Sequence, residues 1–147
     1  MTKVAIYGAT GYTGFELIRL LLSHSKAKIS ALSSEQYSDL PYGQAFPSFR
    51  GMLANAAFGK MEQIRSVDVD AVFLALPHTV SASVAAEILP RGPRVVDLSA
   101  DFRFRSIPLY EAVYGVRHVS PELGERAVYG LPEIYRDALR KTPLAAV

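Results

Sequence analysis

The fold of this chain is decided by its opening residues, Lys3-Val4-Ala5-Ile6-Tyr7-Gly8-Ala9-Thr10-Gly11-Tyr12-Thr13-Gly14. The apolar first part predicts a β-strand from Val4 to Tyr7. Three glycines spaced Gly-x-x-Gly-x-x-Gly follow, and the segment from Tyr12 to His24 then carries apolar side chains at helical spacing. A glycine-rich turn between a strand and a helix is typical of nucleotide-binding α/β domains.

Each glycine has its own predicted role. Gly8 permits the tight turn, Gly11 lets a diphosphate approach the main chain, and Gly14 lets the helix pack closely against the strand. The free N–H groups and the partial positive charge at the start of the helix attract the same anion. The other predicted contacts in this loop are Thr10, Tyr12 and Thr13.

Two other interpretations of the loop are open. Its glycines serve a purely structural turn in one of them. In the other, the residues from Thr13 to Glu16 fit a capping box, which begins a helix whether or not anything binds. A P-loop is excluded because no Gly-Lys-Ser/Thr sequence follows.

Composition restricts the function classes. Half of the 147 residues are hydrophobic and the net charge is only +2, which indicates a globular protein without affinity for nucleic acid. No apolar run approaches the roughly 20 residues of a membrane span, and the chain enters its first strand without a signal peptide, so we expect a cytoplasmic protein. The absence of cysteine excludes a thiolate nucleophile in these residues, and the three histidines lack the i, i+4 spacing of a zinc pair.

Strand-like and helix-like segments alternate along the chain. The predicted strands are 4–7, 28–33, 71–76 and 94–98, and the predicted helices are 12–24 and 79–89. Strands separated by crossover helices predict a Rossmann-type α/β fold, with a parallel sheet and helices on both faces. Residues 34–59 and 99–141 are expected to be mostly irregular, the second segment with short helices at 108–114 and 132–139.

The last residues, Pro143-Leu144-Ala145-Ala146-Val147, have the pattern of another buried strand. A domain rarely ends where a strand begins. We therefore expect residues 1–147 to form one NAD(P)-binding domain that is a piece of a longer protein.

Ligands of parallel sheets bind at the carboxyl ends of the strands. About twenty residues past the glycine loop, the second strand ends in Ser33-Ser34-Glu35. An acid at this place usually accepts the ribose hydroxyls of NAD, whereas the hydroxyls of Ser33 and Ser34 suit the 2′-phosphate of NADP. We favour NADP, although Glu35 argues for NAD if it points inward, and a serine-rich turn is the structural alternative.

The third predicted strand ends in Leu76-Pro77-His78. Pro77 turns the chain, and His78 is predicted to lie over the cofactor. Alternatively, His78 faces solvent at a helix start. No nucleophile lies near it in the sequence, so a role as a general base is not favoured.

The fourth predicted strand leads into Ser99-Ala100-Asp101-Phe102-Arg103-Phe104-Arg105. Ser99 is a candidate hydrogen-bond partner of the nicotinamide or the substrate. Asp101 and Arg103 are candidates for a structural salt bridge, and Arg103 or Arg105 for contact with an acidic substrate. If the Rossmann prediction holds, all four strand-end segments converge on one edge of the sheet.

One class of oxidoreductase is disfavoured by the tyrosines. Short-chain dehydrogenases pair a catalytic tyrosine with a lysine four residues later, and none of the eight tyrosines here has lysine at that spacing.

Five segments, in this order along the chain, resemble the N-acetyl-gamma-glutamyl-phosphate reductase family, which is related to aspartate-semialdehyde dehydrogenase. They are Val4 to Gly14, Phe49-Arg50-Gly51, Ala75-Leu76-Pro77-His78, Asp97 to Arg103, and Tyr129-Gly130-Leu131-Pro132-Glu133. The resemblance covers nearly the whole chain, and the order of the five segments is more specific than the glycine loop alone.

The resemblance implies a two-step reaction of arginine biosynthesis. A cysteine thiolate displaces phosphate from the acyl phosphate, and NADPH then reduces the thioester to N-acetylglutamate semialdehyde. The family's cysteine follows an apolar strand, but this chain contains no cysteine. The resemblance therefore implies cofactor contacts only, and it predicts that this fragment is inactive. The implied contacts are Gly8, Gly11, Gly14, Ser33, Ser34, Pro77, His78 and Ser99. Many relatives place an arginine near Glu35, and its absence here weakens the preference for NADP.

Two alternatives differ in function class. One is a stand-alone NAD(P)-binding or sensor module without catalysis, and the other is the cofactor domain of an aspartate-semialdehyde dehydrogenase. The family resemblance implies a small acyl-phosphate substrate and a homo-oligomer for the full-length enzyme, without nucleic-acid or membrane partners.

Overall fold

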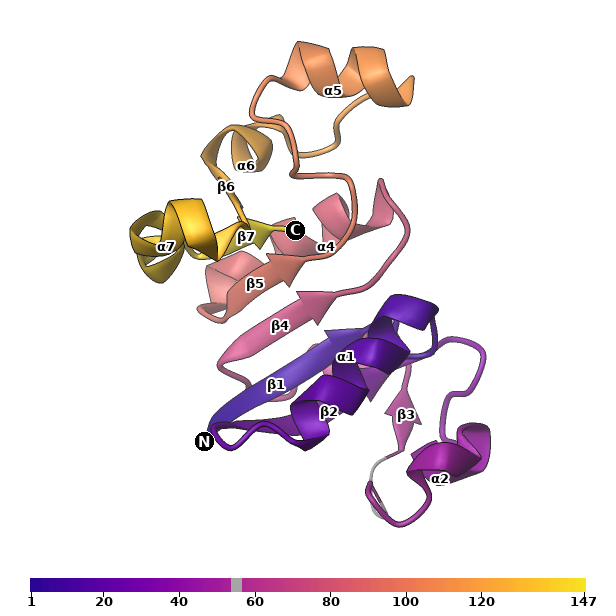
Figure 1. Ribbon diagram of the computed structural model, residues 1–147. Helices are drawn as coiled ribbons and strands as arrows, with labels where there is room; N and C mark the ends of the chain where they lie inside the picture. Colours follow the sequence, from indigo (N-terminus) through magenta and orange to yellow (C-terminus); the bar gives the residue numbers. More distant parts are fainter. Residues whose placement is uncertain (54–56) are drawn as a thin grey trace. The chain divides into compact units, whose positions relative to one another are not determined.

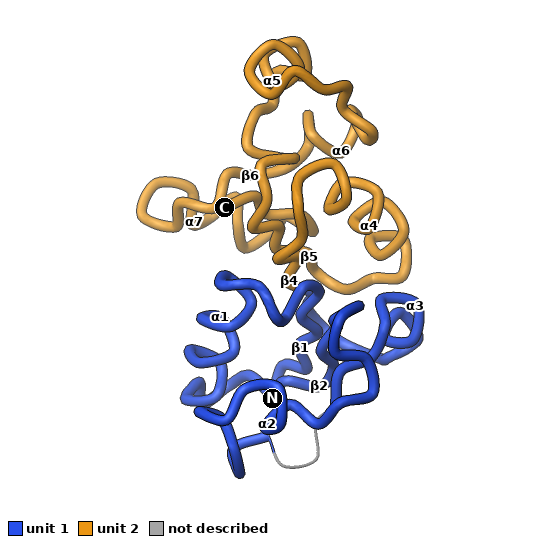
Figure 2. Tube along the Cα trace, turned by 90° about the vertical axis from the view of Figure 1, so that its right-hand side faces the viewer, with its two compact units in different colours: residues 1–72 blue, residues 73–147 orange. Residues whose placement is uncertain are grey.

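The computed structural model describes residues 1–53 and 57–147. It divides into two compact units, residues 1–72 and residues 73–147 (Figure 2). Strand β4 (Ala71–Leu74) contains the boundary between them. Each unit has its own strands and helices, and each holds part of the predicted ligand contacts.

Unit 1 begins with the predicted strand, glycine loop and helix. Its elements are β1 (Thr2–Tyr7), α1 (Tyr12–Leu22), β2 (Ala27–Ser33), α2 (Tyr42–Ala45), the 3-10 helix η1 (Pro47–Phe49), β3 (Phe58–Gly59) and α3 (Met61–Ile64). The strand order is β3-β2-β1, and both pairs are parallel, with Val4 beside Ile29 and Leu32 beside Phe58. Helices α1 and α3 lie on opposite faces of these strands (Figure 2).

An aromatic cluster anchors the segment between β2 and β3. Tyr42 is fully buried, and its ring centroid lies 5.0 Å from that of Phe58 and 5.5 Å from that of Phe49. Phe49 in turn lies 4.8 Å from Phe15 on α1. This packing turns a segment that we expected to be mostly irregular into α2, η1 and β3. Burial raises the pKa of the Tyr42 phenol to about 12.

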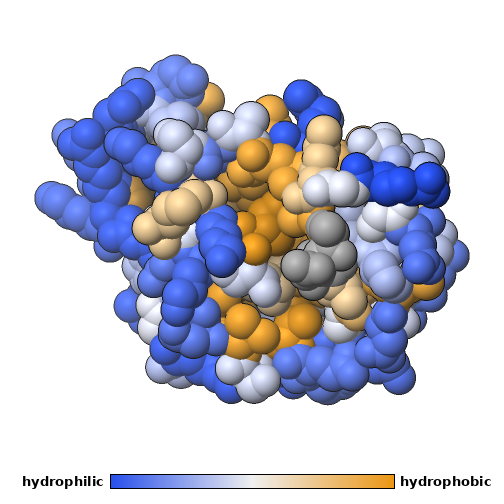
Figure 3. All heavy atoms as spheres, turned by 90° about the horizontal axis from the view of Figure 1, so that it is seen from below, coloured by the Kyte–Doolittle hydropathy of each residue, from blue (hydrophilic) through white to orange (hydrophobic). Residues whose placement is uncertain are grey.

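Not all apolar side chains are covered. Seen from below, hydrophobic residues gather at the centre of the face and hydrophilic residues surround them (Figure 3). In unit 1, Phe15, Leu22, Phe49 and Met52 line an open groove between α1 and η1. Within the described residues, no helix combines the length and the apolar character that crossing a membrane requires.

Unit 2 is also a parallel α/β structure. Its elements are α4 (Val80–Ile88), the 3-10 helix η2 (Leu89–Arg91), β5 (Arg94–Asp97), α5 (Ile107–Tyr114), α6 (Pro121–Arg126), β6 (Val128–Tyr129), α7 (Pro132–Lys141) and β7 (Leu144–Ala146). The strand order is β5-β7-β6, with both pairs parallel (Figure 1). Helices α4 and α7 lie on opposite sides of these strands (Figure 2).

The predicted α/β class with a parallel sheet is therefore confirmed. The predicted strands and helices are present, with ends that differ by one or two residues, and the strand suspected at residues 143–147 is β7. The sequence pattern missed α6 and β6, because a two-residue strand and a helix of less than two turns are too short to show a period.

Candidate functional site

The glycine loop of unit 1 leaves open space beside the start of α1. Gly8 has a φ of +75°, which side chains disfavour, and it makes the turn that was predicted for it. A Cβ added at Gly11 would lie 3.7 Å from the Gly8 carbonyl oxygen, within ordinary contact distance. Gly11 itself has a φ of −71° and a ψ of 163°, a conformation that any residue adopts. Neither backbone conformation nor protein packing therefore requires glycine at position 11.

Gly14 has the opposite environment. A Cβ at this position would lie 2.4 Å from the Gly8 carbonyl oxygen and 2.8 Å from the Ala9 Cα. The helix can approach the loop this closely only because residue 14 has no side chain, as the spacing predicted. Gly8 and Gly14 thus shape the loop, and Gly11 leaves its surface bare.

The loop is held from below by the end of β2. The Gly8 N–H donates to the Ser33 hydroxyl at 3.0 Å, and the Ala9 N–H donates to the Ser33 carbonyl at 2.9 Å. The hydroxyls of Thr10 and Ser34 lie 3.3 Å apart. Ser33 and Ser34 are both buried, so their hydroxyls support the loop. Their predicted contact with a 2′-phosphate stays a prediction.

Helix α1 starts without a side-chain cap. Its N-cap residue is Gly11, and the Phe15 N–H already donates to the Gly11 carbonyl at 2.8 Å. The capping box expected at Thr13 is therefore wrong, because Thr13 lies inside the helix. Glu16 forms an ion pair with Arg19 at 2.5 Å instead. No side chain accepts a hydrogen bond from the first turn of α1, so N–H groups of that turn are directed to the space beside the loop. Tyr12 and Thr13, the first two residues of the turn, are exposed.

Glu35 is directed toward α3. Its carboxylate accepts the Met61 N–H at 3.1 Å. On the other side of Lys60, the Gly59 carbonyl accepts the Ser34 N–H at 3.0 Å. Both neighbours of Lys60, Gly59 and Met61, are therefore hydrogen-bonded to the residues that follow β2. Lys60 is exposed and forms no ion pair within the part of the chain that the structure describes. Lys60 lies 25 residues after Glu35 in the chain, so no local sequence pattern connects the two residues. Only the pairing of β2 with β3 brings Lys60 close to the end of β2, as the Leu32–Phe58 register shows.

In unit 2, one buried carboxylate organises the strand-end loops. Asp101 is fully buried, and it accepts the Thr79 N–H at 2.7 Å, the Ala82 N–H at 2.9 Å and the Tyr110 hydroxyl at 3.0 Å. Thr79 has a φ of +73°, which is costly for a β-branched residue. Asp101 therefore caps α4 and holds the strained turn that follows Pro77 and His78.

The loop after β5 belongs to the same network. The Ser99 hydroxyl donates to Asp97 at 2.8 Å and accepts the Asp101 N–H at 3.1 Å. Asp97 is fully buried, and burial raises the pKa of its carboxyl group. Ser99 is buried as well, so its predicted contact with nicotinamide or substrate stays a prediction.

His118 completes this network from a distant part of the chain. Its Nδ1 accepts the Ser120 N–H at 3.0 Å, which requires that the proton be on Nε2. The Nε2–H then donates to the Asp101 carbonyl at 2.7 Å. His118 and Tyr110 were not singled out from the sequence, and only the fold brings them to Asp101.

The salt bridge expected between Asp101 and Arg103 is wrong. The carboxylate of Asp101 is occupied by α4 and Tyr110, and Arg103 points away from it. The Arg103 guanidinium donates to the Val147 carbonyl at 3.1 Å and to the Leu98 carbonyl at 3.4 Å. Asp101 has a structural role, as the predicted salt bridge implied, but its partners are Thr79, Ala82 and Tyr110.

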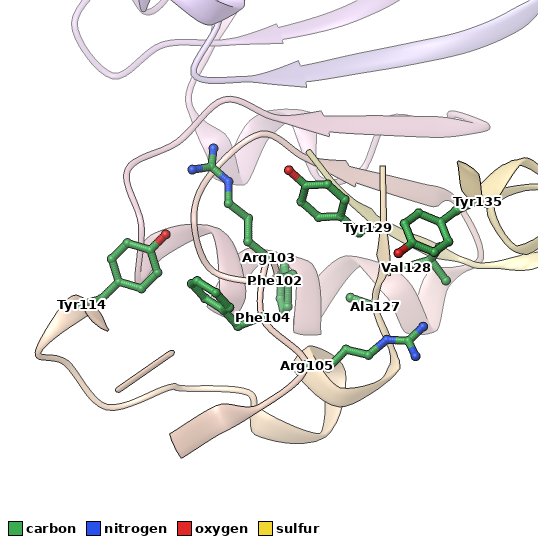
Figure 4. A pocket seen from close by; sticks show the side chains of 9 residues that line it. All are labelled: Phe102, Arg103, Phe104, Arg105, Tyr114, Ala127, Val128, Tyr129 and Tyr135. Atoms are coloured by element: carbon green, nitrogen blue, oxygen red, sulfur yellow. The ribbon is translucent and has the colours of Figure 1, made fainter. Parts of the chain in front are cut away.

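A pocket of about 560 Å³ lies next to this loop (Figure 4). Its lining consists of Phe102, Arg103, Phe104, Arg105, Tyr114, Ala127, Val128, Tyr129 and Tyr135. The Tyr114 ring stacks on His78, with centroids 6.2 Å apart, and lies 6.0 Å from Phe104. One wall of the pocket is therefore in contact with the exposed His78.

Each unit brings together two of the four predicted strand-end segments. In unit 1 the loop from Gly8 to Gly14 meets Ser33 and Ser34, and in unit 2 the Pro77-His78 turn meets the loop from Ser99 to Asp101. Among the described residues, no group of three or more histidine, aspartate or glutamate side chains is arranged to hold a metal ion.

Comparison with known proteins adds independent information. Residues 3–142 match the family model described as semialdehyde dehydrogenase, NAD binding domain. The chain is 45% identical over 141 residues to N-acetyl-gamma-glutamyl-phosphate reductase of Janthinobacterium sp. (strain Marseille), which covers 96% of this chain and 41% of the relative. It is also 45% identical to the enzyme of the same name from Heliobacterium modesticaldum, over 99% of this chain and 42% of the relative.

Among solved structures, aspartate semialdehyde dehydrogenase II from Vibrio cholerae, complexed with ASA, matches with a TM-score of 0.68 at 20% identity. The match covers 99% of this chain and 37% of that one, and it shows a shared fold. The chain thus spans about two fifths of the length of the relatives it matches.

Proposed function

This chain belongs to the family of semialdehyde dehydrogenase NAD-binding domains, and from that premise we propose that it is the cofactor-binding part of an N-acetyl-gamma-glutamyl-phosphate reductase. In the proposed reaction, N-acetyl-gamma-glutamyl phosphate is reduced to N-acetylglutamate semialdehyde. The proposed cofactor is NADP. The relatives with this name are 45% identical, whereas the aspartate semialdehyde dehydrogenase match is 20% identical, so the acetylglutamate substrate is better supported than aspartyl phosphate.

The bare main chain at Gly11 is the observation that carries the proposal. The residues fit a dinucleotide, because the space that a side chain at position 11 would fill is open and adjoins the first turn of α1. The N–H groups of that turn, at Tyr12 and Thr13, would bind a diphosphate. Ser33 and Ser34 hold the loop from beneath, through Gly8 and Thr10.

The surroundings of Ser34 support NADP over NAD. The Glu35 carboxylate accepts the Met61 N–H, so the acid that would accept ribose hydroxyls in an NAD site is directed to α3. Lys60 supplies a cation close to the end of β2, where the family resemblance implied an arginine that this chain lacks. An ammonium group attracts the 2′-phosphate, which NAD lacks.

Pro77, His78 and Ser99 are the proposed contacts of the nicotinamide end. Bound NADPH supplies a hydride equivalent. This chain contributes binding and orientation: Asp101 fixes the turn that carries His78. The chain contains no cysteine, so it lacks the thiolate that the family reaction uses, and we expect it to bind cofactor without turnover.

The proposed partners follow from the same assignment. They are a small acyl-phosphate substrate and, for the full-length enzyme, further copies of itself. We place the enzyme in the cytoplasm, where amino-acid biosynthesis takes place.

A fluorescence titration of the 147-residue chain with NADPH and NADH tests the proposal. We expect saturable binding of both, with NADPH bound about tenfold more tightly because its 2′-phosphate meets a cation. Lys60→Gln should remove this preference, whereas the matched Lys28→Gln, at an exposed position near the start of β2, should preserve it. Absence of saturable binding of either dinucleotide contradicts the proposed function.

A further inference from the structure

The ring of His78 is in contact with helix α5. The Tyr114 ring lies 6.2 Å from it, centroid to centroid, with 29° between the two planes, which is a stacked arrangement. His78 is exposed, so Tyr114 covers one face of the imidazole and the remainder of the ring faces solvent. An exposed side chain without such a neighbour changes rotamer freely. The contact with Tyr114 therefore restricts where the His78 ring can lie.

Tyr114 is itself supported by Tyr110, one helical turn earlier on α5. The two ring centroids lie 5.0 Å apart, and Tyr110 is buried. Residues four positions apart lie on the same face of a helix. Leu109 and Val113, which precede the two tyrosines, are exposed, so the face of α5 with the tyrosines is the one that packs on the rest of unit 2.

One oxygen atom joins the two supports of His78. The Asp101 Oδ1 accepts the Tyr110 hydroxyl at 3.0 Å and the Thr79 N–H at 2.7 Å. The first bond fixes the helix that carries Tyr114, and the second fixes the backbone directly after His78. The ring and the backbone of His78 are therefore positioned from the same buried atom. A side chain that is fixed in this way loses little freedom when a ligand binds to it.

We propose that Tyr114 is a positioning residue, which stacks on His78 and holds its ring in place for contact with the nicotinamide of the bound dinucleotide. The inference rests on the proposed function and extends it to α5, a helix to which none of the predicted cofactor contacts belongs. Tyr114 acts through His78 and not by touching the cofactor. Its removal should therefore weaken only those ligands that carry the nicotinamide.

The test compares two ligands of the 147-residue chain by calorimetric titration. One is NADPH, and the other is 2′-phospho-ADP-ribose, which is NADPH without its nicotinamide. We expect the parent to bind NADPH more tightly of the two. Tyr114→Leu should weaken NADPH about fivefold and leave 2′-phospho-ADP-ribose unchanged, since a stacked aromatic pair is lost. Tyr114→Phe keeps the ring, and Val113→Ala truncates an exposed side chain on the same helix, so both should bind like the parent.

A double-mutant cycle separates positioning from general damage. His78→Ala removes an exposed ring and should weaken NADPH at least as much as Tyr114→Leu does. Adding Tyr114→Leu to His78→Ala should cost nothing further, because Tyr114 acts through His78. Tyr114 is half-buried in the last turn of α5, so its replacement should leave the fold intact, and melting temperatures close to that of the parent will show this.

Four results would each overturn the inference. They are unchanged NADPH affinity in folded Tyr114→Leu or His78→Ala, equal losses for the two ligands, additive losses in the double variant, and a Tyr114→Phe variant that behaves like Tyr114→Leu. If the parent binds NADPH in any of these cases, the proposed function stands and only the role of Tyr114 fails. If the parent binds neither ligand, the cofactor assignment fails, and the inference that rests on it fails as well.

Discussion

The glycine loop of unit 1 and the Asp101 network of unit 2 solve the same problem in different ways. Each holds a turn at the end of a strand in a fixed shape. The glycine loop does so by omitting side chains, with Gly14 packed against the main chain at a distance that no Cβ tolerates. The Asp101 network does so with a buried polar side chain that accepts three hydrogen bonds. The first leaves bare backbone for a ligand, and the second leaves a rigid turn that presents His78.

The comparison predicts that the network is the more fragile of the two. Asp101→Ala leaves the Thr79 N–H, the Ala82 N–H and the Tyr110 hydroxyl without their acceptor, and it removes what holds the strained turn. We expect a loss of about 4 kcal/mol in the free energy of unfolding, measured by urea denaturation. The control is Asp137→Ala, whose carboxylate is exposed and which should be neutral. A small effect at Asp101 would show that the turn is held by other contacts.

The second prediction concerns packing in the glycine loop. Gly14→Ala places a Cβ 2.4 Å from the Gly8 carbonyl oxygen, so α1 must move. We expect a loss of about 2 kcal/mol by the same measurement. Gly11→Ala is its matched control, because a Cβ there meets nothing closer than 3.7 Å. If both variants were equally stable, the close approach of helix and loop would not be what defines this turn.

The third prediction concerns the support beneath the loop. Ser33→Ala removes the acceptor of the Gly8 N–H, and we expect a cost of about 1 kcal/mol in stability together with weaker NADPH binding. Ser30→Ala, at an exposed position on the same strand, is the control. A loss of NADPH affinity with NADH affinity intact would instead assign Ser33 to the 2′-phosphate, as the sequence analysis predicted.

The smallest effect is expected from Asp97, and it depends on pH. Burial raises the pKa of Asp97 above its unfolded value near 3.9, so the folded state takes up the proton first as the pH falls. The free energy of unfolding of the parent should therefore rise relative to that of Asp97→Asn as the pH drops through the raised pKa, and the difference should level off below the unfolded value. Urea denaturation of both chains across this range checks the sign, and a difference that falls with falling pH would contradict it.

The two regions also differ in how far the sequence predicts them. The glycine loop follows from local spacing, since strand, turn and helix are consecutive, and the separate roles of Gly8 and Gly14 are as expected. The segment that ends in Ser33 and Ser34 was located correctly as well. Its hydroxyls support the loop, which spacing alone cannot distinguish from binding a phosphate.

The Asp101 network does not follow from spacing, because its members lie far apart in the chain. Thr79 donates to Asp101 across 22 residues, and His118 bonds to it across 17 in the other direction. Local pattern therefore suggested the wrong partner, Arg103, which is only two residues away. Lys60 was missed for the same reason, since it reaches the end of β2 only through strand pairing.

The central claim is that Gly11 lacks a side chain for the sake of a ligand and not of the fold. Gly11→Val tests it most directly, because the backbone conformation there suits valine and the space is open. NADPH titration by fluorescence, with the melting temperature measured in parallel, should show a folded chain that no longer binds NADPH saturably. A folded Gly11→Val chain with the NADPH affinity of the parent would contradict the account.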